Sequence, residues 1–144
     1  MHPRIARFLA AALGLVALAG PGCATTPRTP ADHARDRLET IVDQHQDQRS
    51  FRVRLNPVPC DCPPFEVLLG DAWRRAFLEP PGDDGPVGAL QTRLLEAEAR
   101  GDALQAPVAG SLSGGVRLAP NRLPCVVLKV STVCPDAGCP DEGE

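Results

Sequence analysis

Cysteine is the residue type with the most distinctive chemistry in this chain, and four of the six cysteines stand in short Pro-rich motifs. Cys60 and Cys62 lie in PCDCPP, and Cys134 and Cys139 lie in the tandem CPDAG and CPDEG. Such stretches cannot form an ordinary core, and thiols in an oxidising compartment form disulfides. We predict that Cys60 and Cys62 pair with Cys134 and Cys139, in an order that the sequence leaves open.

A metal site built from the same four thiolates is the alternative. The C-x4-C spacing suits a metal, whereas C-x-C is shorter than the usual C-x2–4-C knuckle. We therefore expect disulfides, no metal and no other cofactor, and keep a secreted thiol or metal-binding protein as the second hypothesis. Cys125 adjoins Val126 and Val127 and is predicted to be free and buried.

The N-terminus has the pattern of a secretory signal, which would deliver these cysteines to an oxidising compartment. Arg4 and Arg7 precede the uncharged run FLAAALGLVALAG at residues 8–20. A positive start and a short apolar run are typical of a signal peptide, and the run is below the ~20 residues that span a bilayer as a helix. We predict a signal peptide at residues 1–22.

The residues that precede Cys23 resemble the cleavage region of bacterial lipoproteins. GPG occupies positions 20–22, although that class prefers an aliphatic residue at the first of them. The resemblance covers residues 1–23 and implies a lipid on Cys23, whose acyl chains would anchor the mature protein to a membrane. Ala24, in place of Asp, implies sorting to the outer membrane. The alternative is ordinary cleavage after Ala19, which would leave a soluble periplasmic product.

Charge and location together limit the partners. The whole chain has a net charge of −3, and a signal with two arginines and no acid would leave the mature chain at −5. Such a balance is unsuited to nucleic acid. We expect a cell-envelope protein at the outer membrane, facing the periplasm, with the membrane as a partner through the lipid. An envelope protein or glycan is the candidate ligand.

Two segments flank the predicted domain. The first part of residues 23–50 is rich in Pro and Thr. The rest is a polar stretch in which Leu38, Ile41 and Val42 have helical spacing. We predict a lipid-anchored linker with a weak helix. Residues 134–144 form an acidic tail that carries the last two cysteines.

Residues 51–133 have the patterns of a small β-rich domain. Strict alternation of apolar and polar residues predicts a half-buried strand over 51–55. A Gly-Asp turn predicts a hairpin of strands over 65–69 and 72–78.

After the hairpin the pattern predicts one helix and a return to strands. Leu90, Leu94 and Ala97 recur at helical spacing, with Asp84 as the N-cap and Gly101 as the stop. A Ser-Gly-Gly turn is predicted between the next two strands, and the strands that follow the helix are expected at 108–112, 116–118 and 126–130.

This order of three strands, one helix and two or three strands resembles the OB-fold, a five-stranded Greek-key barrel with a helix between its third and fourth strands. An open β-sheet packed on a single helix shares the order. The prediction is therefore a mainly β fold with one helix, either a small OB-like barrel or such a sheet.

The outer face of the hairpin is the candidate binding surface. Its residues include Trp73, Arg75 and Phe77, and Glu66 faces Arg75 across the two strands. Trp and Arg are enriched at interface hot spots. The alternative is that the predicted helix covers this face and makes Trp73 part of the core. Because residues 51–133 offer no His or Tyr to activate a nucleophile, we expect binding or scaffolding and not catalysis.

Overall fold

The computed structural model describes residues 26–139, which form a closed five-stranded barrel with two helices. In chain order the elements are α1 (Pro30–Gln44), β1 (Ser50–Leu55), β2 (Phe65–Leu69), β3 (Ala72–Glu79), α2 (Pro86–Ala99), β4 (Ala106–Leu118) and β5 (Pro124–Val133). The barrel closes in the order β1-β2-β3-β5-β4, and only β3 and β5 pair in parallel. The OB-like barrel prediction is confirmed, and the open sheet is wrong.

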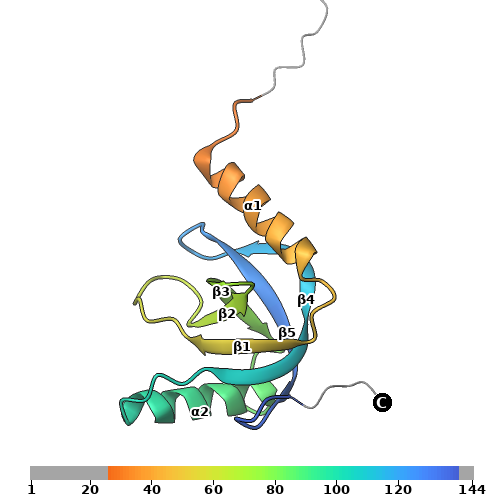
Figure 1. Ribbon diagram of the computed structural model, residues 1–144. Coiled ribbons are helices and arrows are strands. Elements are labelled where there is room, and N and C mark those ends of the chain that lie inside the picture. Colours follow the sequence, from red (N-terminus) through yellow and green to blue (C-terminus); the bar gives the residue numbers. More distant parts are fainter. Residues whose placement is uncertain (1–25, 140–144) are drawn as a thin grey trace, which may run out of the picture.

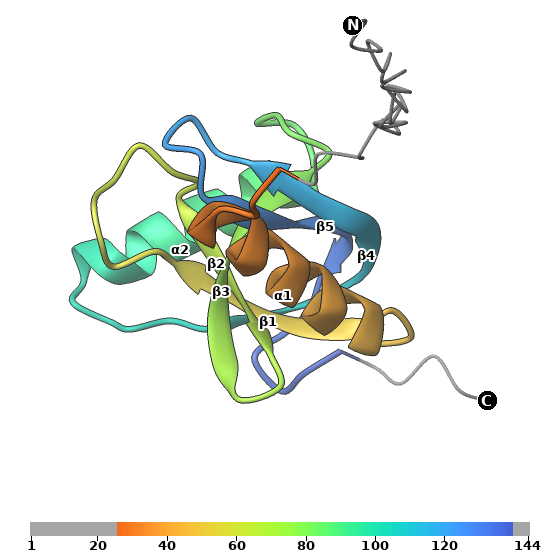
Figure 2. The ribbon, with the colours of Figure 1, turned by 90° about the horizontal axis from the view of Figure 1, so that it is seen from above.

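The two helices lie at opposite ends of the barrel (Figure 1), and the view from above shows α1 crossing its end of the barrel (Figure 2). α2 closes the other end with Leu90 and Leu94, which are fully buried. α1 adds Leu38 and Val42 to the same core. The sequence predicted only a weak helix within a linker here. The packed domain therefore begins at α1 and not at Phe51, because the barrel supplies the apolar surface that this narrow stripe buries.

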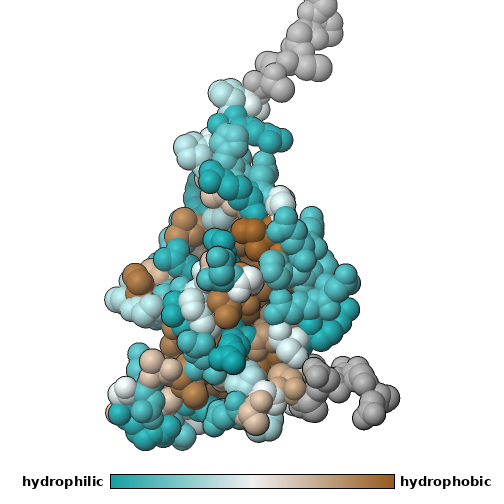
Figure 3. Space-filling model, viewed as in Figure 1, coloured by the Kyte–Doolittle hydropathy of each residue, from teal (hydrophilic) through white to brown (hydrophobic). Residues whose placement is uncertain are grey.

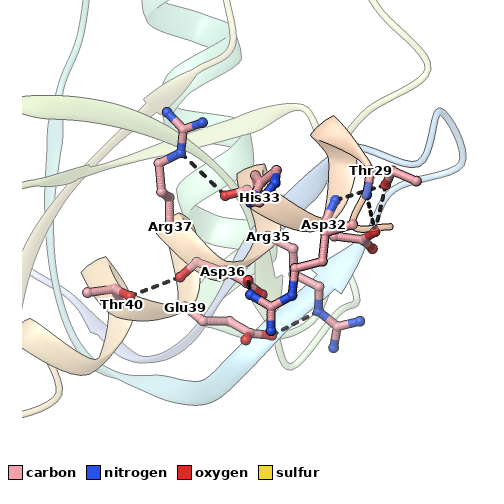
Figure 4. Close-up of polar contacts among 9 residues, drawn as sticks. Thr29, Asp32, His33, Arg35, Asp36, Arg37, Glu39 and Thr40 are labelled. Atoms are coloured by element: carbon pink, nitrogen blue, oxygen red, sulfur yellow. Dashed lines mark hydrogen bonds and ion pairs between the residues drawn. The ribbon is translucent and has the colours of Figure 1, made fainter. Parts of the chain in front are cut away.

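A reciprocal hydrogen-bond pair starts α1. The Asp32 backbone N–H donates to Thr29 Oγ1 at 3.2 Å, and the Thr29 N–H donates to the Asp32 carboxylate at 2.7 Å (Figure 4). Such a capping box satisfies two of the donors that a helix start leaves free. The Asp32 carboxylate accepts hydrogen bonds from the Thr29 N–H and from the Thr29 hydroxyl, and these lower the pKa of the Asp32 carboxyl. Their support is therefore present at neutral pH and is lost as the pH falls through the lowered value. The outward surface of α1 is hydrophilic (Figure 3).

The β2–β3 hairpin has the predicted register. Leu69 lies opposite Ala72 and Glu66 lies opposite Arg75. Gly70 occupies the turn with φ of 64°, a conformation that favours glycine. The apolar face of the hairpin is turned into the barrel, where its buried side chains are Phe65, Val67, Leu69, Ala76 and Leu78.

β4 is one long strand, so the prediction of two strands joined by a turn is wrong. The Ser-Gly-Gly segment is a bulge, since the register with β5 shifts between Leu112 and Val116, and an earlier shift falls between Ala109 and Gly110. Bulges bend a strand and increase its twist. At the earlier shift the extra residue, Ser131, is on β5. The beginning of β4 pairs with β1 and most of its length pairs with β5, and this closes the barrel.

The start of α2 differs by one residue from the prediction. Pro86 occupies the first helical position, where its missing N–H costs nothing. The N-cap therefore falls on Gly85, with no side-chain hydrogen bond, and the predicted N-cap, Asp84, lies one residue too early.

Candidate ligand-binding cleft

β3 carries the three predicted binding residues, and the structure separates them. Trp73 and Arg75 line a cleft of about 660 Å³ between α1 and the hairpin. Phe77 does not line it: the Arg117 guanidinium lies over the Phe77 ring at 5.2 Å from the centroid and pairs with Glu79. Two of the three predicted residues thus share one site.

We call this space the α1–β3 cleft. Its residues come from α1 on one side and from the barrel on the other: Ala34, Arg37, Leu38, Ile41, Glu66, Trp73, Arg74, Arg75 and Pro124. Trp73 is half-buried, and α2 packs against β5 and β1 and not over it. The alternative in which the second helix covers Trp73 is therefore wrong.

Glu66 has an arginine opposite it on each neighbouring strand, and it pairs with only one of them. Arg54 on β1 and Arg75 on β3 both face Glu66 in register. The Glu66 carboxylate accepts from Arg54 Nη2 at 2.7 Å and from Arg54 Nε at 2.8 Å. The Arg54 guanidinium also lies 4.2 Å from the centre of the Trp73 ring. The predicted register is correct, but Arg75 is left without this carboxylate.

Three arginines of the cleft have uncompensated charge. Within residues 26–139, Arg37, Arg74 and Arg75 form no ion pair with a carboxylate. The Nε atoms of Arg74 and Arg75 are shielded from solvent and have no hydrogen-bond acceptor among the described residues. A buried donor without a partner costs about 1–3 kcal/mol, and native proteins leave few of them. The charge of the three guanidinium groups is therefore not compensated within the described residues, and two of them also contain a shielded Nε–H without an acceptor.

Arg37 is positioned by its own helix. Its Nε donates to the His33 carbonyl at 3.4 Å, one turn earlier. The Arg37 guanidinium points away from the Arg35–Glu39 ion pair (Figure 4). The terminal nitrogens of Arg37 thus lie apart from the Glu39 carboxylate, which pairs with Arg35.

The lining chemistry suits binding of an anion. Glu66 is the one acid among the residues that line the cleft, and Arg54 engages it. No Ser, Thr, His or Cys is among those lining residues. Cys125, just beyond Pro124, is buried and free as predicted. Burial raises the pKa of the Cys125 thiol, against a smaller opposite effect of Arg75, so the thiol is protonated and unreactive at neutral pH.

The sequence did not indicate Arg37 or Arg74 as site residues. Arg74 follows the alternation onto the inner face of the hairpin, where it is the single charged residue. β5 pairs with β3 only from Ala76 to Glu79, so Arg74 lies at the rim beyond that ladder. A single charged residue on the apolar face of the hairpin was the signal in the sequence that could have indicated Arg74.

The disulfides join neighbours in sequence, so the predicted pairing across the domain is wrong. Cys60 pairs with Cys62, and Cys134 pairs with Cys139. The first pair lies beside Leu95 of α2. Cys139 of the second pair lies in another part of the surface, with Gln48 and with Gly70 of the β2–β3 turn. Among the described residues no three His, Cys, Asp or Glu side chains are grouped to hold a metal.

The C-terminal tail is held by α2 and not by the lead-in of β2. Arg93 of α2 donates to the Cys134 carbonyl at 2.9 Å and forms an ion pair with Asp136. Cys134 itself is buried. The beginning of the tail is thus part of the packed domain.

A second depression, of about 740 Å³, lies over β4 and β5 and includes Lys129, Ser111 and Glu79. Glu79 is neutralised by Arg117, and no aromatic ring lines this depression. It also lacks the shielded, unpaired guanidinium nitrogens of the α1–β3 cleft. The α1–β3 cleft is therefore the stronger candidate site.

Fold and cleft together define a small OB-like barrel with a cationic, tryptophan-lined surface cleft. No protein family, curated protein or solved structure was found to match the chain. Of the helices within residues 26–139, neither has the length and apolar character needed to cross a membrane.

Proposed function

We propose that this chain is a lipid-anchored protein of the cell envelope, at the outer membrane and facing the periplasm, whose barrel binds a ligand in the α1–β3 cleft. The observation that carries the binding part is the group of unpaired arginines beside Trp73. Trp and Arg in a desolvated pocket are the residues that most often dominate binding energy. The volume of the cleft is also within the range of small-molecule sites.

The lipid part of the proposal is supported by the signal pattern and by Cys23, which lie outside the described residues. Residues 24–29 connect Cys23 to the start of α1, and six extended residues span at most about 20 Å. A lipid on Cys23 would therefore hold the barrel close to the membrane surface, with α1 as the element nearest to the anchor.

Replacing Cys23 by Ser is expected to move the protein from the membrane fraction to the soluble periplasmic fraction, because the thioether that carries the acyl chains cannot form. Fractionation with an immunoblot, together with the intact mass of the wild-type protein, measures this. A wild-type protein without acyl mass, and a variant that stays with the membrane, would contradict the anchor.

Trp73 gives a direct measure of the binding part, because it is the single Trp of the chain. We expect a protein-free extract of the cell envelope to change the Trp73 emission of the Cys23→Ser chain, and Arg75→Gln to abolish that change. Arg52→Gln removes an exposed charge of β1 outside the cleft and serves as the matched control. An emission that no extract alters would contradict binding at this cleft.

A further inference from the structure

Resting on the proposed function, we propose that the group bound in the α1–β3 cleft is a phosphate, carried either by a soluble phosphoester or by a phospholipid headgroup. Arg37 on α1 and Arg74 and Arg75 on β3 would bind its oxygens, with Trp73 at the side of the site. The juxtaposition that supports this is three guanidinium groups around one cleft that form no ion pair within residues 26–139.

The number of unpaired charges favours phosphate over a carboxylate. A carboxylate brings one charge and two oxygens, which one guanidinium fork can satisfy. A phosphomonoester carries about −1.5 to −2 charges at neutral pH and has three strong acceptor oxygens. The planar guanidinium matches phosphate geometry in the same bidentate way. A phosphomonoester therefore compensates more of the positive charge of three unpaired arginines than a carboxylate does.

Among the residues that the structure describes, no unpaired carboxylate lines the cleft beside these arginines. Asp36 and Glu39, the acids of α1 that flank Arg37, are engaged by Arg28 and Arg35. Glu66, the acid of the cleft, is engaged by Arg54. The positive charge of the cleft is therefore available to a ligand.

Part of the lining of the cleft is apolar. Leu38 and Ile41 of α1 and the ring of Trp73 are among its lining residues, although more of its exposed surface is polar. Where such side chains flank a guanidinium group they lower the local dielectric, and an ion pair is stronger there than in open water. The shielded Nε atoms of Arg74 and Arg75 show that water does not reach the inner side of these guanidinium groups.

Calorimetric titration of the signal-free Cys23→Ser chain tests the phosphate class. We expect inorganic phosphate and glycerol 3-phosphate to bind and acetate at matched ionic strength to bind far more weakly. Arg74→Gln and Arg75→Gln should each weaken phosphate binding by about 10-fold or more, because each removes a charge-assisted hydrogen bond. Arg52→Gln should leave binding unchanged, and circular dichroism confirms that each variant is folded.

Vesicles distinguish the two sources of the phosphate. Flotation with phosphatidylcholine vesicles, with and without phosphatidic acid, measures headgroup binding by the same chain. Binding that needs phosphatidic acid and is reduced by Arg75→Gln supports the headgroup, and binding of glycerol 3-phosphate alone supports a soluble phosphoester. Equal affinity for acetate, or no binding of any phosphate probe, would overturn the phosphate class. If Trp73 still responds to envelope extract in that case, the proposed function stands; if it does not, both fail.

Discussion

Replacing Leu90 by Ala is expected to lower the free energy of unfolding by about 2–5 kcal/mol. Leu90 is fully buried at the end of the barrel that α2 closes, and it belongs to the hydrophobic core that the strands and both helices share. The substitution removes buried methyl groups and leaves a cavity that the surrounding strands can fill only in part. Urea unfolding followed by circular dichroism measures the loss.

Leu95→Ala is the matched control for this substitution. Leu95 lies on the same helix, and 47% of its surface is exposed. The same change of side chain there should alter the free energy of unfolding by only about 0.5 kcal/mol. If both variants lost the same amount, α2 would not pack against the barrel as described.

Gly110→Ala is expected to destabilise the protein by about 1–3 kcal/mol or more, because it crowds the point where β4 and β5 shift register and approach closely. A Cβ at Gly110 would lie 2.2 Å from the carbonyl oxygen of Lys129 on β5. The obstacle is backbone, so no side-chain rotation can relieve it, and the two strands must move apart. The Gly110 N–H also donates to the Arg49 carbonyl at 2.9 Å, a bond that such a movement would strain.

Gly114→Ala in the same strand provides the control. A Cβ at Gly114 would meet no atom within 4 Å. We expect its free energy of unfolding to stay within about 0.5 kcal/mol of the wild type. Thermal unfolding of the two variants side by side measures the difference, and equal midpoints would show that β4 and β5 do not approach closely at Gly110.

The elements that the sequence predicts well are those whose geometry is local. A two-residue turn and strict alternation determine the register of the β2–β3 hairpin, so Leu69 and Ala72 could be paired from the sequence. The Ser-Gly-Gly segment of β4 has the same local signal as a turn. It is a bulge because β4 pairs with the same partner, β5, on both sides of this segment, and that partner lies in a later part of the chain.

Distant packing also explains the errors at α1 and at the cysteines. Three apolar residues on an otherwise polar helix do not indicate which part of the chain the helix packs against. Leu38 and Val42 are buried by a barrel whose strands come later in the sequence. Cysteine motifs predict disulfides but not which thiols are close in space. The observed pairs close very short loops, since Cys60 and Cys62 are two residues apart.

Only the part of the candidate site on the outer face of the β2–β3 hairpin could be predicted from the sequence. Alternation places Trp73 and Arg75 on the outer face of the hairpin, and both line the cleft. Arg37 became a site residue because α1 packs over the barrel, and Arg74 because it lies beyond the end of the β3–β5 ladder. The unpaired state of Arg75 could not be predicted either, since the choice of Glu66 between two arginines depends on side-chain geometry.

The central claim is that the arginines of the α1–β3 cleft bind an anion, and the Nε–H signals of arginine in a proton–nitrogen correlation spectrum test it most directly. The Nε atoms of Arg74 and Arg75 are shielded from solvent, so their protons should exchange slowly and be visible. On titration of the Cys23→Ser chain with inorganic phosphate, we expect these two signals to shift with one common affinity while the Arg52 backbone amide signal in the same spectrum stays in place. Signals of Arg74 and Arg75 that do not move at saturating phosphate, or that move no more than that of Arg52, would contradict the account.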